Sequence, residues 1–346
     1  MMSTSARKDD HLHIALERDV SFSETTTGLE AFSFVHQALP EMDLEDIDTS
    51  TTFLGHRLSF PLLIASMTGG TPQTGVVNQA LAEAAQAAGI GMGLGSTRAM
   101  LEDPSVVETF QVRNSAPDVL LLANLGAVQL NYGYTVEDCR RLVDLTGADA
   151  LYLHLNPLQE TLQPEGNTHF SDLVRRIESV CAALPVPVVV KEVGGGLSPR
   201  TARLLVDAGV AALDVAGAGG TSWSQVEMHR LASSADREVA ASFRDWGIPT
   251  AASIRMVRGV DPAIPLVASG GLTTGIDIAK SIALGADVAS LATPILRAAL
   301  ESPEALLSKI AVLRRQLCIA MFLTASRNIQ ALKRAELIAA RPRGDA

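Results

Sequence analysis

The sequence predicts an α/β protein that forms one (β/α)8 TIM barrel, preceded by an N-terminal arm and a hairpin extension. Three observations support this fold. Hydrophobic residues occupy 47% of the 346 positions but aromatic residues only 4%, so the core is aliphatic. Short apolar runs recur along the chain, eight times in all. Between them lie helical patterns that end at glycine, and this alternation indicates parallel strands joined by helices.

The eight apolar runs are about five or six residues long and continuous rather than alternating, which is typical of strands buried on both faces. They are Pro61–Ser66, Ile90–Gly95, Val119–Asn124, Asp149–His154, Pro187–Lys191, Ala211–Ala216, Pro265–Ser269 and Val288–Ala292. The competing fold is an open doubly wound sheet, which usually carries Gly-x-Gly-x-x-Gly after its first strand. Here the first run leads into Ser66-Met67-Thr68-Gly69-Gly70, so this signal is missing and the strand count favours the barrel.

The segments between the runs predict helices with capping residues at their ends. Thr135 with Asp138 three positions later predicts a capping box, and Ser198-Pro199 predicts an N-cap followed by proline at the first helical position. The expected helices are Val77–Ala88 ended by Gly89, a helix from Thr135 to Gly147, Asp172–Leu184 capped by Ser171, a helix from Ser198 to Gly209, Ile276–Leu284 ended by Gly285, and a last helical region opened by Ser302-Pro303.

The first barrel strand begins only at Pro61. We therefore divide the chain into an arm and hairpin extension over residues 1–60 and a barrel with C-terminal helices over residues 61–346. Within the extension, Thr49–Phe60 surrounds Gly55-His56-Arg57 and predicts a β-hairpin that plugs the bottom of the barrel.

Composition argues against several classes of protein. The net charge of −10 argues against nonspecific nucleic-acid binding. Cys139, Cys181 and Cys318 are odd in number and far apart, which supports neither a disulfide framework nor a zinc site. No apolar run reaches the roughly 20 residues that a membrane span needs, and Met1–Asp19 lacks the apolar core of a signal peptide. We expect a cytoplasmic protein with no nucleic-acid partner and no membrane span.

Small or polar residues follow each predicted strand at its C-terminal end, where the active site of this fold forms. They are Ser66, Met67 and Thr68; Ser96, Thr97 and Arg98; Asn124; His154, Asn156, Gln159 and Glu160; Lys191; Thr221; Gly270, Gly271 and Leu272; Ala292 and Thr293. Singly, a serine or asparagine there most often caps a helix, a histidine is often a core residue, and a loop glutamate or lysine is often solvated. Their recurrence at all eight strand ends predicts a functional site.

The loops after the seventh and eighth strands of such barrels commonly bind phosphate through backbone N–H groups. Gly270-Gly271 and Ala292-Thr293 occupy these loops, so flavin mononucleotide or a sugar phosphate would fit. Lys191 would then place a cation beside an electron-rich cofactor ring. Glu160 is a candidate Mg²⁺ ligand, completed by substrate oxygens and water.

The charged run from Arg7 and Lys8 to His11 offers a second anion site if the arm folds over the barrel mouth near Arg98. We expect this arm to be disordered or exposed in the free protein and to close over the substrate as a lid. Closure could come from the same subunit or from a neighbouring one.

Taken together, these motifs resemble those of type 2 isopentenyl diphosphate isomerase. The segments that carry the resemblance are Arg7-Lys8-x-x-His11, Met67-Thr68-Gly69-Gly70, Ser96-x-Arg98, Ala123-Asn124-Leu125-Gly126, His154-x-Asn156-x-x-Gln159-Glu160, Val190-Lys191-Glu192-Val193-Gly194 and Gly219-Gly220-Thr221-Ser222-Trp223. The likeness extends from about Arg7 to the last helices. Two departures are Thr97, where many relatives have Gln, and Leu272-Thr273, where an Arg is common after the glycine pair.

The resemblance implies an FMN-binding barrel that interconverts isopentenyl diphosphate and dimethylallyl diphosphate. It implies a need for Mg²⁺ and for reduced flavin supplied through NADPH, and a homo-oligomer, either a tetramer or an octamer. The implied FMN contacts are Ser66, Met67, Thr68, Ser96, Asn124, Lys191, Thr221, Gly270, Gly271, Leu272, Ala292 and Thr293. The implied substrate contacts are Arg7, Lys8, Ser96, Thr97, Arg98, His154, Asn156 and Gln159, with Glu160 as the metal ligand and His154, Gln159 and Lys191 as catalytic residues. The proton carrier stays open between the flavin and a side chain such as Gln159.

The nearest alternative is an FMN oxidoreductase on the same fold. A 2-hydroxy-acid oxidase is expected to carry His-Gly-Gly-Arg at the seventh strand, where this chain has Ser269-Gly270-Gly271-Leu272. An inosine-monophosphate dehydrogenase needs a catalytic cysteine after the sixth strand, and none of the three cysteines lies there. A flavin-binding sensor without turnover would need neither Arg7-Lys8 nor Gln159-Glu160.

Overall fold

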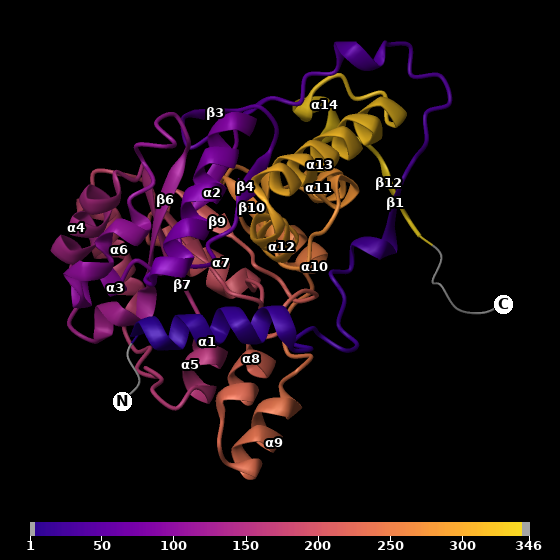
Figure 1. The fold of residues 1–346 in the computed structure, drawn as a ribbon. Helices are drawn as coiled ribbons and strands as arrows, with labels where there is room; N and C mark the ends of the chain where they lie inside the picture. Colours follow the sequence, from indigo (N-terminus) through magenta and orange to yellow (C-terminus); the bar gives the residue numbers. More distant parts are fainter. Residues whose placement is uncertain (1–3, 341–346) are drawn as a thin grey trace.

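Eight parallel strands form a closed barrel in the computed structural model, which describes residues 4–340 apart from the side chains of residues 4–9 and 12 (Figure 1). The strands follow one another around the barrel in chain order, and the last closes on the first. They are β4 (Leu62–Ile64), β5 (Gly91–Gly93), β6 (Leu121–Gly126), β7 (Ala150–His154), β8 (Val188–Lys191), β9 (Ala212–Asp214), β10 (Leu266–Ser269) and β11 (Val288–Leu291). The predicted barrel is confirmed, and only β6 extends beyond its predicted apolar run.

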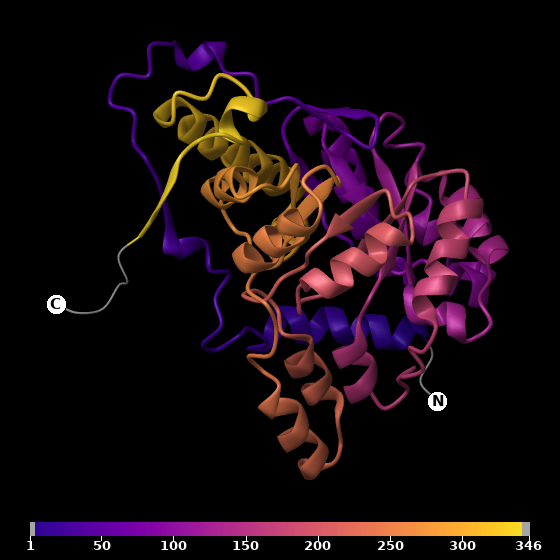
Figure 2. The same cartoon turned by 180° about the vertical axis from the view of Figure 1, so that it is seen from behind.

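Helices surround the barrel on its outer side (Figures 1 and 2). The α-helices after β4 are α2 (Pro72–Ala88), α3 (Ala99–Glu102), α4 (Val136–Thr146), α5 (Pro157–Leu162), α6 (Leu173–Ala183), α7 (Pro199–Asp207), α8 (Trp223–Arg230), α9 (Ser234–Ser242), α10 (Thr250–Val260), α11 (Gly275–Ala283), α12 (Thr293–Glu301), α13 (Pro303–Leu323) and α14 (Ile329–Leu332). Short 3-10 helices are η1 (Leu29–Ala31), η2 (Leu44–Asp46), η3 (Pro104–Phe110) and η4 (Ala127–Asn131). The predicted caps at Thr135, Ser198 and Ser302 are confirmed, since each hydroxyl accepts from a backbone N–H in the first turn.

Two helix starts differ from the prediction. Helix α2 begins at Pro72 rather than Val77, because Thr71 and Thr74 form a reciprocal capping box that the sequence analysis overlooked. Ser171 does not cap α6. The N-cap there is Asp172, which has a φ of 57° and makes no side-chain capping bond.

The hairpin of β2 (Thr51–Phe53) and β3 (His56–Leu58) lies at the end of the barrel opposite α1 (Figure 1). Phe53 and Leu58 are 2% and 1% exposed and pack in one cluster with barrel residues that include Tyr152 and Val189. The predicted hairpin is therefore present, and its apolar side chains cover the N-terminal ends of the barrel strands.

The N-terminal extension is tied to the barrel and to the C-terminus. Strand β1 (Phe32–Phe34) pairs antiparallel with β12 (Leu337–Ala339). Helix α1 (Thr4–Glu17) crosses the mouth end of the barrel beside α5 and α8 (Figures 1 and 2). The expectation of a disordered arm therefore differs from the structure, because this segment forms a helix that packs on α8.

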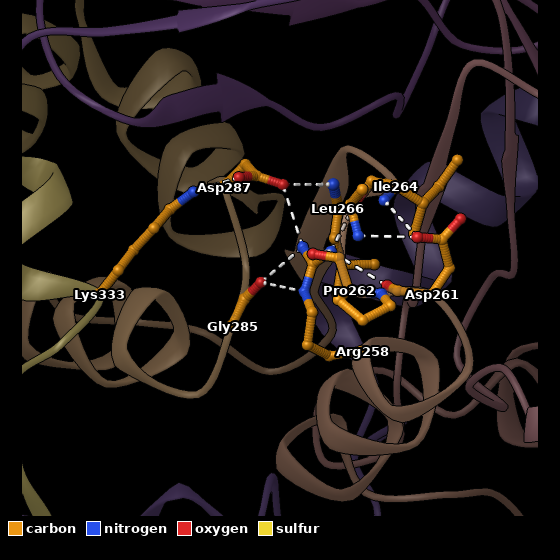
Figure 3. Close-up of polar contacts among 9 residues, drawn as sticks. Arg258, Asp261, Pro262, Ile264, Leu266, Gly285, Asp287 and Lys333 are labelled. Carbon is orange, nitrogen blue, oxygen red and sulfur yellow. Dashed lines mark hydrogen bonds and ion pairs between the residues drawn. The ribbon is translucent and has the colours of Figure 1, made fainter.

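One arginine clamp joins the start of β10 to the start of β11 (Figure 3). The guanidinium of Arg258 donates to the backbone oxygens of Asp261, Pro262, Ile264 and Gly285 and to the Asp287 carboxylate. Asp287 also accepts from the Leu266 amide and pairs with Lys333.

The same clamp recurs between β6 and β7. Arg113 donates to four backbone oxygens and to the Asp149 carboxylate, which accepts from the Leu121 amide. Each arginine stands eight residues before the start of a strand. Arg113 precedes Leu121 of β6, and Arg258 precedes Leu266 of β10. These clamps hold the N-terminal strand ends together, away from the mouth.

No helix within residues 4–340 combines the length and the apolar character that crossing a bilayer requires.

Candidate functional site

The site lies at the C-terminal ends of the barrel strands, where helix α12 begins directly after β11. Its N-cap residue, Ala292, offers no side-chain acceptor, and its backbone oxygen accepts from the Ile295 and Leu296 N–H groups, which leaves the Thr293 N–H at the start of the helix. Helix α11 differs, because Thr274 and Asp277 form a capping box at its start. An anion brought to these loops is therefore directed to the start of α12, beside Thr293.

Glycines allow the neighbouring loops to pack closely at this position. Gly270 and Gly271 have φ values of 98° and 74°, a region that favours glycine. A Cβ on Gly270 would lie 2.0 Å from the oxygen of Gly217, and one on Gly271 would lie 2.5 Å from the oxygen of Gly219. The β9 and β10 loops thus touch backbone to backbone, and Leu272 beyond them is buried at 3% exposure.

Two hydroxyls after β4 are buried without a protein partner. Within the described residues, Ser66 Oγ and Thr68 Oγ1 have no hydrogen-bond partner although both atoms are inaccessible to solvent. A buried polar group left unpaired is costly, so such atoms indicate a missing ligand. The backbone oxygen of Thr68 also accepts from Asn78 Nδ2, which fixes this loop.

Asn124 at the end of β6 orients His154 at the end of β7. Asn124 Nδ2 donates to the Leu94 oxygen, which turns Oδ1 toward His154 Nδ1 at 2.9 Å. Because Oδ1 is an acceptor, Nδ1 of His154 donates the proton of this hydrogen bond.

Lys191 ends β8 beside a buried acidic cluster. It is paired in register with Asp214 on β9, and its Nζ donates to the Glu192 oxygen at 3.1 Å. Asp214 accepts from Tyr152 Oη at 3.1 Å and from Ser269 Oγ at 2.5 Å. Burial lowers the pKa of Lys191, and the carboxylates of Asp214 and Glu192 oppose that shift. Burial likewise raises the pKa of Asp214, against the effect of Lys191.

A buried hydrogen-bond chain passes through Gln159 on α5. Asn156 Nδ2 donates to Gln159 Oε1 at 3.0 Å, and Gln159 Nε2 donates to Glu227 Oε1 at 2.9 Å. All three side chains are less than 10% exposed. The amide of Gln159 is therefore held in one orientation between a donor and a carboxylate.

Glu160, the next residue of α5, is held by three donors. Its Oε1 accepts from Asn156 Nδ2 at 3.0 Å, and its Oε2 accepts from Gln163 Nε2 at 2.5 Å and from the Asn167 amide at 2.6 Å. Asn156 Oδ1 beside it is buried and has no partner within the described residues. Among all the described residues, no group of three or more His, Cys, Asp or Glu side chains is arranged to hold a metal ion.

Helix α1 reaches the same cluster through His11. His11 Nε2 lies 2.9 Å from Glu227 Oε1, and its ring meets Trp223 edge to face at 5.3 Å. Glu227 Oε2 accepts from Arg230 Nη1 at 2.6 Å. Burial raises the pKa of Glu227, but the hydrogen bonds from His11, Gln159 and Arg230 outweigh it, so the pKa lies below its usual range. Glu227 is therefore ionised at neutral pH.

The remaining predicted substrate contacts divide into three groups. Arg98 is 13% exposed and pairs with Glu102 at 3.0 Å. Thr97 is fully buried and its hydroxyl donates to the Asn124 oxygen at 2.8 Å, which ties it to β6; its role as a substrate contact stays a prediction. The side chains of Arg7 and Lys8 lie outside the described residues, although their backbone belongs to α1.

Other predicted contacts line the mouth from the loops. Met67 is partly buried against the core. Ser96 is half-buried ahead of α3. Thr221 forms a β-bridge with Ser21, which brings the segment after α1 against the β9 loop.

The sequence analysis missed Asp214, Glu227 and Arg230. Asp214 interrupts the apolar run Ala211–Ala216, and a carboxylate inside a buried strand is itself a signal of a functional site. Glu227 and Arg230 looked like an ordinary exposed helix pair, and only the packing of α1 and α5 on α8 shows that both are buried.

Fold and site together define a flavin-binding β/α barrel, and comparison with known proteins agrees. The FMN-dependent dehydrogenase family model matches residues 3–111 and 153–339. An isopentenyl-diphosphate delta-isomerase of Nostoc sp. is 52% identical over 330 residues, which is 95% of this chain and 94% of the relative. Those of Synechococcus sp. and Rickettsia bellii are 54% and 53% identical, covering 96% of this chain and 95% and 96% of the relatives. The chain belongs to the FMN-dependent dehydrogenase family and, within it, to the type 2 isopentenyl-diphosphate delta-isomerases.

Solved structures share the fold at low identity. A protein described as a lactate oxidase of Pediococcus acidilactici superposes with a TM-score of 0.67 at 15% identity, covering 99% of this chain and 96% of that one. A mandelate oxidase variant with (S)-mandelic acid gives a TM-score of 0.64 at 20% identity, with coverages of 96% and 94%. These likenesses show the barrel and nothing about the substrate.

Proposed function

We propose that this chain interconverts isopentenyl diphosphate and dimethylallyl diphosphate, with reduced FMN and Mg²⁺ bound at the barrel mouth. The observation that carries the proposal is the buried chain from Asn156 through Gln159 to Glu227, which holds the Gln159 amide in one orientation. The reaction adds a proton at one carbon and removes one from another, so it needs no net oxidant or reductant. The 52% identical relative from Nostoc sp. is named for this isomerisation.

The residues present fit FMN. The unpartnered hydroxyls of Ser66 and Thr68 are suited to polar atoms of a flavin ring, and the start of α12 with the Gly270-Gly271 loop is suited to its phosphate. When bound and reduced, FMN supplies an electron-rich ring that stabilises positive charge on the alkene. Lys191, at the end of β8, would hold a positive charge beside the ring, and NADPH is the proposed external reductant.

The residues beside Glu160 fit Mg²⁺. Carboxylate and amide oxygens are the ligands that this hard cation prefers, and it usually retains several water or substrate oxygens. Glu160 Oε1 and the unpartnered Asn156 Oδ1 provide such oxygens on neighbouring residues. The absence of a three-residue cluster among the described residues is compatible with a site that the substrate diphosphate completes.

The side chains around the proposed substrate have separable roles. Gln159 faces the carbon skeleton and is kept in one orientation by Asn156 and Glu227. His154 donates from Nδ1 to Asn124, which fixes the orientation of its ring, and it would contact the diphosphate. The net charge of −10 would repel a diphosphate, so the site needs local cations. Arg98, together with Arg7 and Lys8 of α1, would supply them. We also propose that the protein is cytoplasmic and forms a homo-oligomer, either a tetramer or an octamer.

The proposal is tested by following isopentenyl diphosphate incubated with the protein, FMN, Mg²⁺ and NADPH. We expect dimethylallyl diphosphate to accumulate to an equilibrium mixture, and the same mixture without reductant to give little product. Incubation in deuterated water should place deuterium in the product. Product formed at the same rate without flavin, or oxidation of the substrate, would contradict the proposal.

A further inference from the structure

The strongest unassigned feature is the guanidinium of Arg230, the last residue of α8. It is 6% exposed and divides its donors between two carboxylates that come from different parts of the chain. Nη1 donates to Glu227 Oε2 at 2.6 Å and Nη2 donates to Glu165 Oε1 at 2.7 Å. Arginine suits such a position because its donors lie in a fixed planar fork.

The first contact acts on Gln159. By taking Oε2 of Glu227, Arg230 leaves Oε1 free to accept from Gln159 Nε2 and to face His11. Glu227 is fully buried, and a buried carboxylate stays ionised only when it is paired and hydrogen-bonded. Without Arg230, this carboxylate would lose its shortest hydrogen bond, and Glu227 Oε2 would no longer be held away from Gln159, so the Gln159 amide would lose its fixed orientation.

The second contact acts on Glu160. Glu165 belongs to the loop after α5, in which the Asn167 amide donates to Glu160 Oε2. Gly166 packs so tightly there that a Cβ would lie 1.7 Å from the Glu160 backbone oxygen. Anchoring Glu165 from α8 therefore holds the loop in the one conformation that presents Asn167 to the Glu160 carboxylate.

We propose that Arg230 is a positioning residue that holds Gln159 and Glu160, neighbours on the short helix α5, in their working orientations from α8. This inference rests on the proposed function and adds a residue that touches neither substrate nor cofactor. It divides into two arms, one through Glu227 to Gln159 and one through Glu165 to Glu160, and the arms can be tested separately.

The chain provides a matched control on α4. Glu137 and Arg140 have the same spacing as Glu227 and Arg230 but are 78% and 42% exposed. Exposed ion pairs contribute little, so Arg140→Gln should leave activity within about twofold of wild type.

The experiment compares Arg230→Gln, Arg230→Lys, Glu165→Gln and Arg140→Gln in the FMN-loaded full-length protein. We expect Arg230→Gln to lower kcat at least about tenfold, with KM within about threefold and FMN content unchanged. Glu165→Gln should raise the Mg²⁺ concentration for half-maximal activity at least about threefold, with kcat at saturating Mg²⁺ nearly unchanged. Arg230→Lys should keep the Glu227 arm and behave like Glu165→Gln, because a point charge cannot serve both carboxylates.

Hydrogen exchange of the Gly166 and Asn167 amides gives a readout that does not depend on turnover. Both amides should exchange faster in Arg230→Gln and Glu165→Gln and at the wild-type rate in Arg140→Gln. Wild-type exchange in Glu165→Gln would overturn the loop arm, and an unchanged kcat in Arg230→Gln would overturn the Gln159 arm. If Arg230→Gln fails to fold, Glu165→Gln and Arg230→Lys still decide the loop arm, and Glu227→Gln, which removes the charge that Arg230 holds, decides the other: an unchanged kcat in Glu227→Gln would overturn the Gln159 arm. A wild-type protein with no isomerase activity would defeat the proposed function, whereas the exchange result would still decide this inference.

Discussion

Lys191 stands at the end of β8 with its charge set by two opposing effects. Burial disfavours its ammonium form, while Asp214 and Glu192 favour it. The cation can be kept at this position because carboxylates surround it. Beside a bound flavin, this cation would stabilise the anionic reduced ring more than the oxidised ring and so raise the flavin's reduction potential.

Replacing Lys191 by Met should leave FMN binding largely intact and lower the flavin's midpoint potential, because the cation no longer stabilises the anionic reduced ring. Each 1.4 kcal/mol of lost differential stabilisation corresponds to about 30 mV for a two-electron couple. Spectroelectrochemical titration measures the shift, and Lys191→Arg, which keeps the charge, serves as the control. An unchanged potential in Lys191→Met would place this side chain away from the ring.

Glu160→Gln should abolish Mg²⁺-dependent turnover while FMN binding persists. A neutral amide binds a hard cation poorly, whereas the flavin contacts come from other strands. Activity is measured across a Mg²⁺ titration, with the exposed Glu178→Gln as the control. Wild-type turnover of Glu160→Gln at limiting Mg²⁺ would return Glu160 to a structural role, in which it only organises the loop through Gln163 and Asn167.

At the scale of elements, helix α1 is the part of the extension that meets the site. It packs on α8, and His11 reaches the buried carboxylate of Glu227. Arg7 and Lys8 precede His11 on the same helix, and this helix crosses the mouth end of the barrel (Figure 1). The proposed lid is therefore a helix that docks through one histidine rather than a loose tail.

Deleting residues 1–10 should raise KM for isopentenyl diphosphate and lower kcat, with FMN content unchanged, because two cations and part of the cover over the carbon skeleton are lost. Steady-state kinetics and flavin absorbance report both quantities. His11→Ala should share part of the defect. His13→Ala is its control, because His13 is 68% exposed and pairs only with Glu17 among its described neighbours. Full activity of the deleted protein would mean that barrel loops alone form the diphosphate pocket.

In the whole molecule, the residues that stabilise the barrel and the residues of the candidate site lie at opposite ends of the strands. The two arginine clamps lie at the N-terminal strand ends, as Figure 3 shows for Arg258, and the candidate site lies at the C-terminal ends. Residues at the first end hold strands together, and residues at the second end are free to be polar and reactive.

Arg258→Met and Arg113→Met should each lower the free energy of unfolding by about 2–4 kcal/mol, because each removes the guanidinium donor from several partly buried carbonyls and one of the donors from a carboxylate. Turnover per folded molecule should not change. Urea denaturation measures the loss, with the exposed Arg327→Met as the control. A clamp variant as stable as wild type would show that the backbone bonds alone hold these strand ends.

The whole barrel should also bind FMN and not FAD. The loops after β10 and β11 offer one phosphate site, at the start of α12. Flavin released by heating and separated by chromatography identifies the cofactor. FAD as the tight ligand would contradict the assignment of a single phosphate site.

The sequence by itself was sufficient to predict the eight strands, the barrel, the hairpin and the line of polar residues at the strand ends. Continuous apolar runs and glycine stops are local properties. The alternation of strands and helices makes the strands parallel, so all their C-terminal ends lie at one end of the barrel. The family motifs around His154 and Lys191 are also local, so they could be recognised without a structure.

Only the tertiary structure decided which of these residues work together. Arg230 and Glu227 resemble an ordinary surface pair in sequence, and they are buried only because α1 and the loop after α5 pack on α8. Thr97 and Thr68 both carry a hydroxyl, yet that of Thr97 is bonded to β6 while that of Thr68 has no partner among the described residues. Burial and the pairing of distant side chains are non-local quantities, and they determine whether a polar residue supports the fold or serves the site.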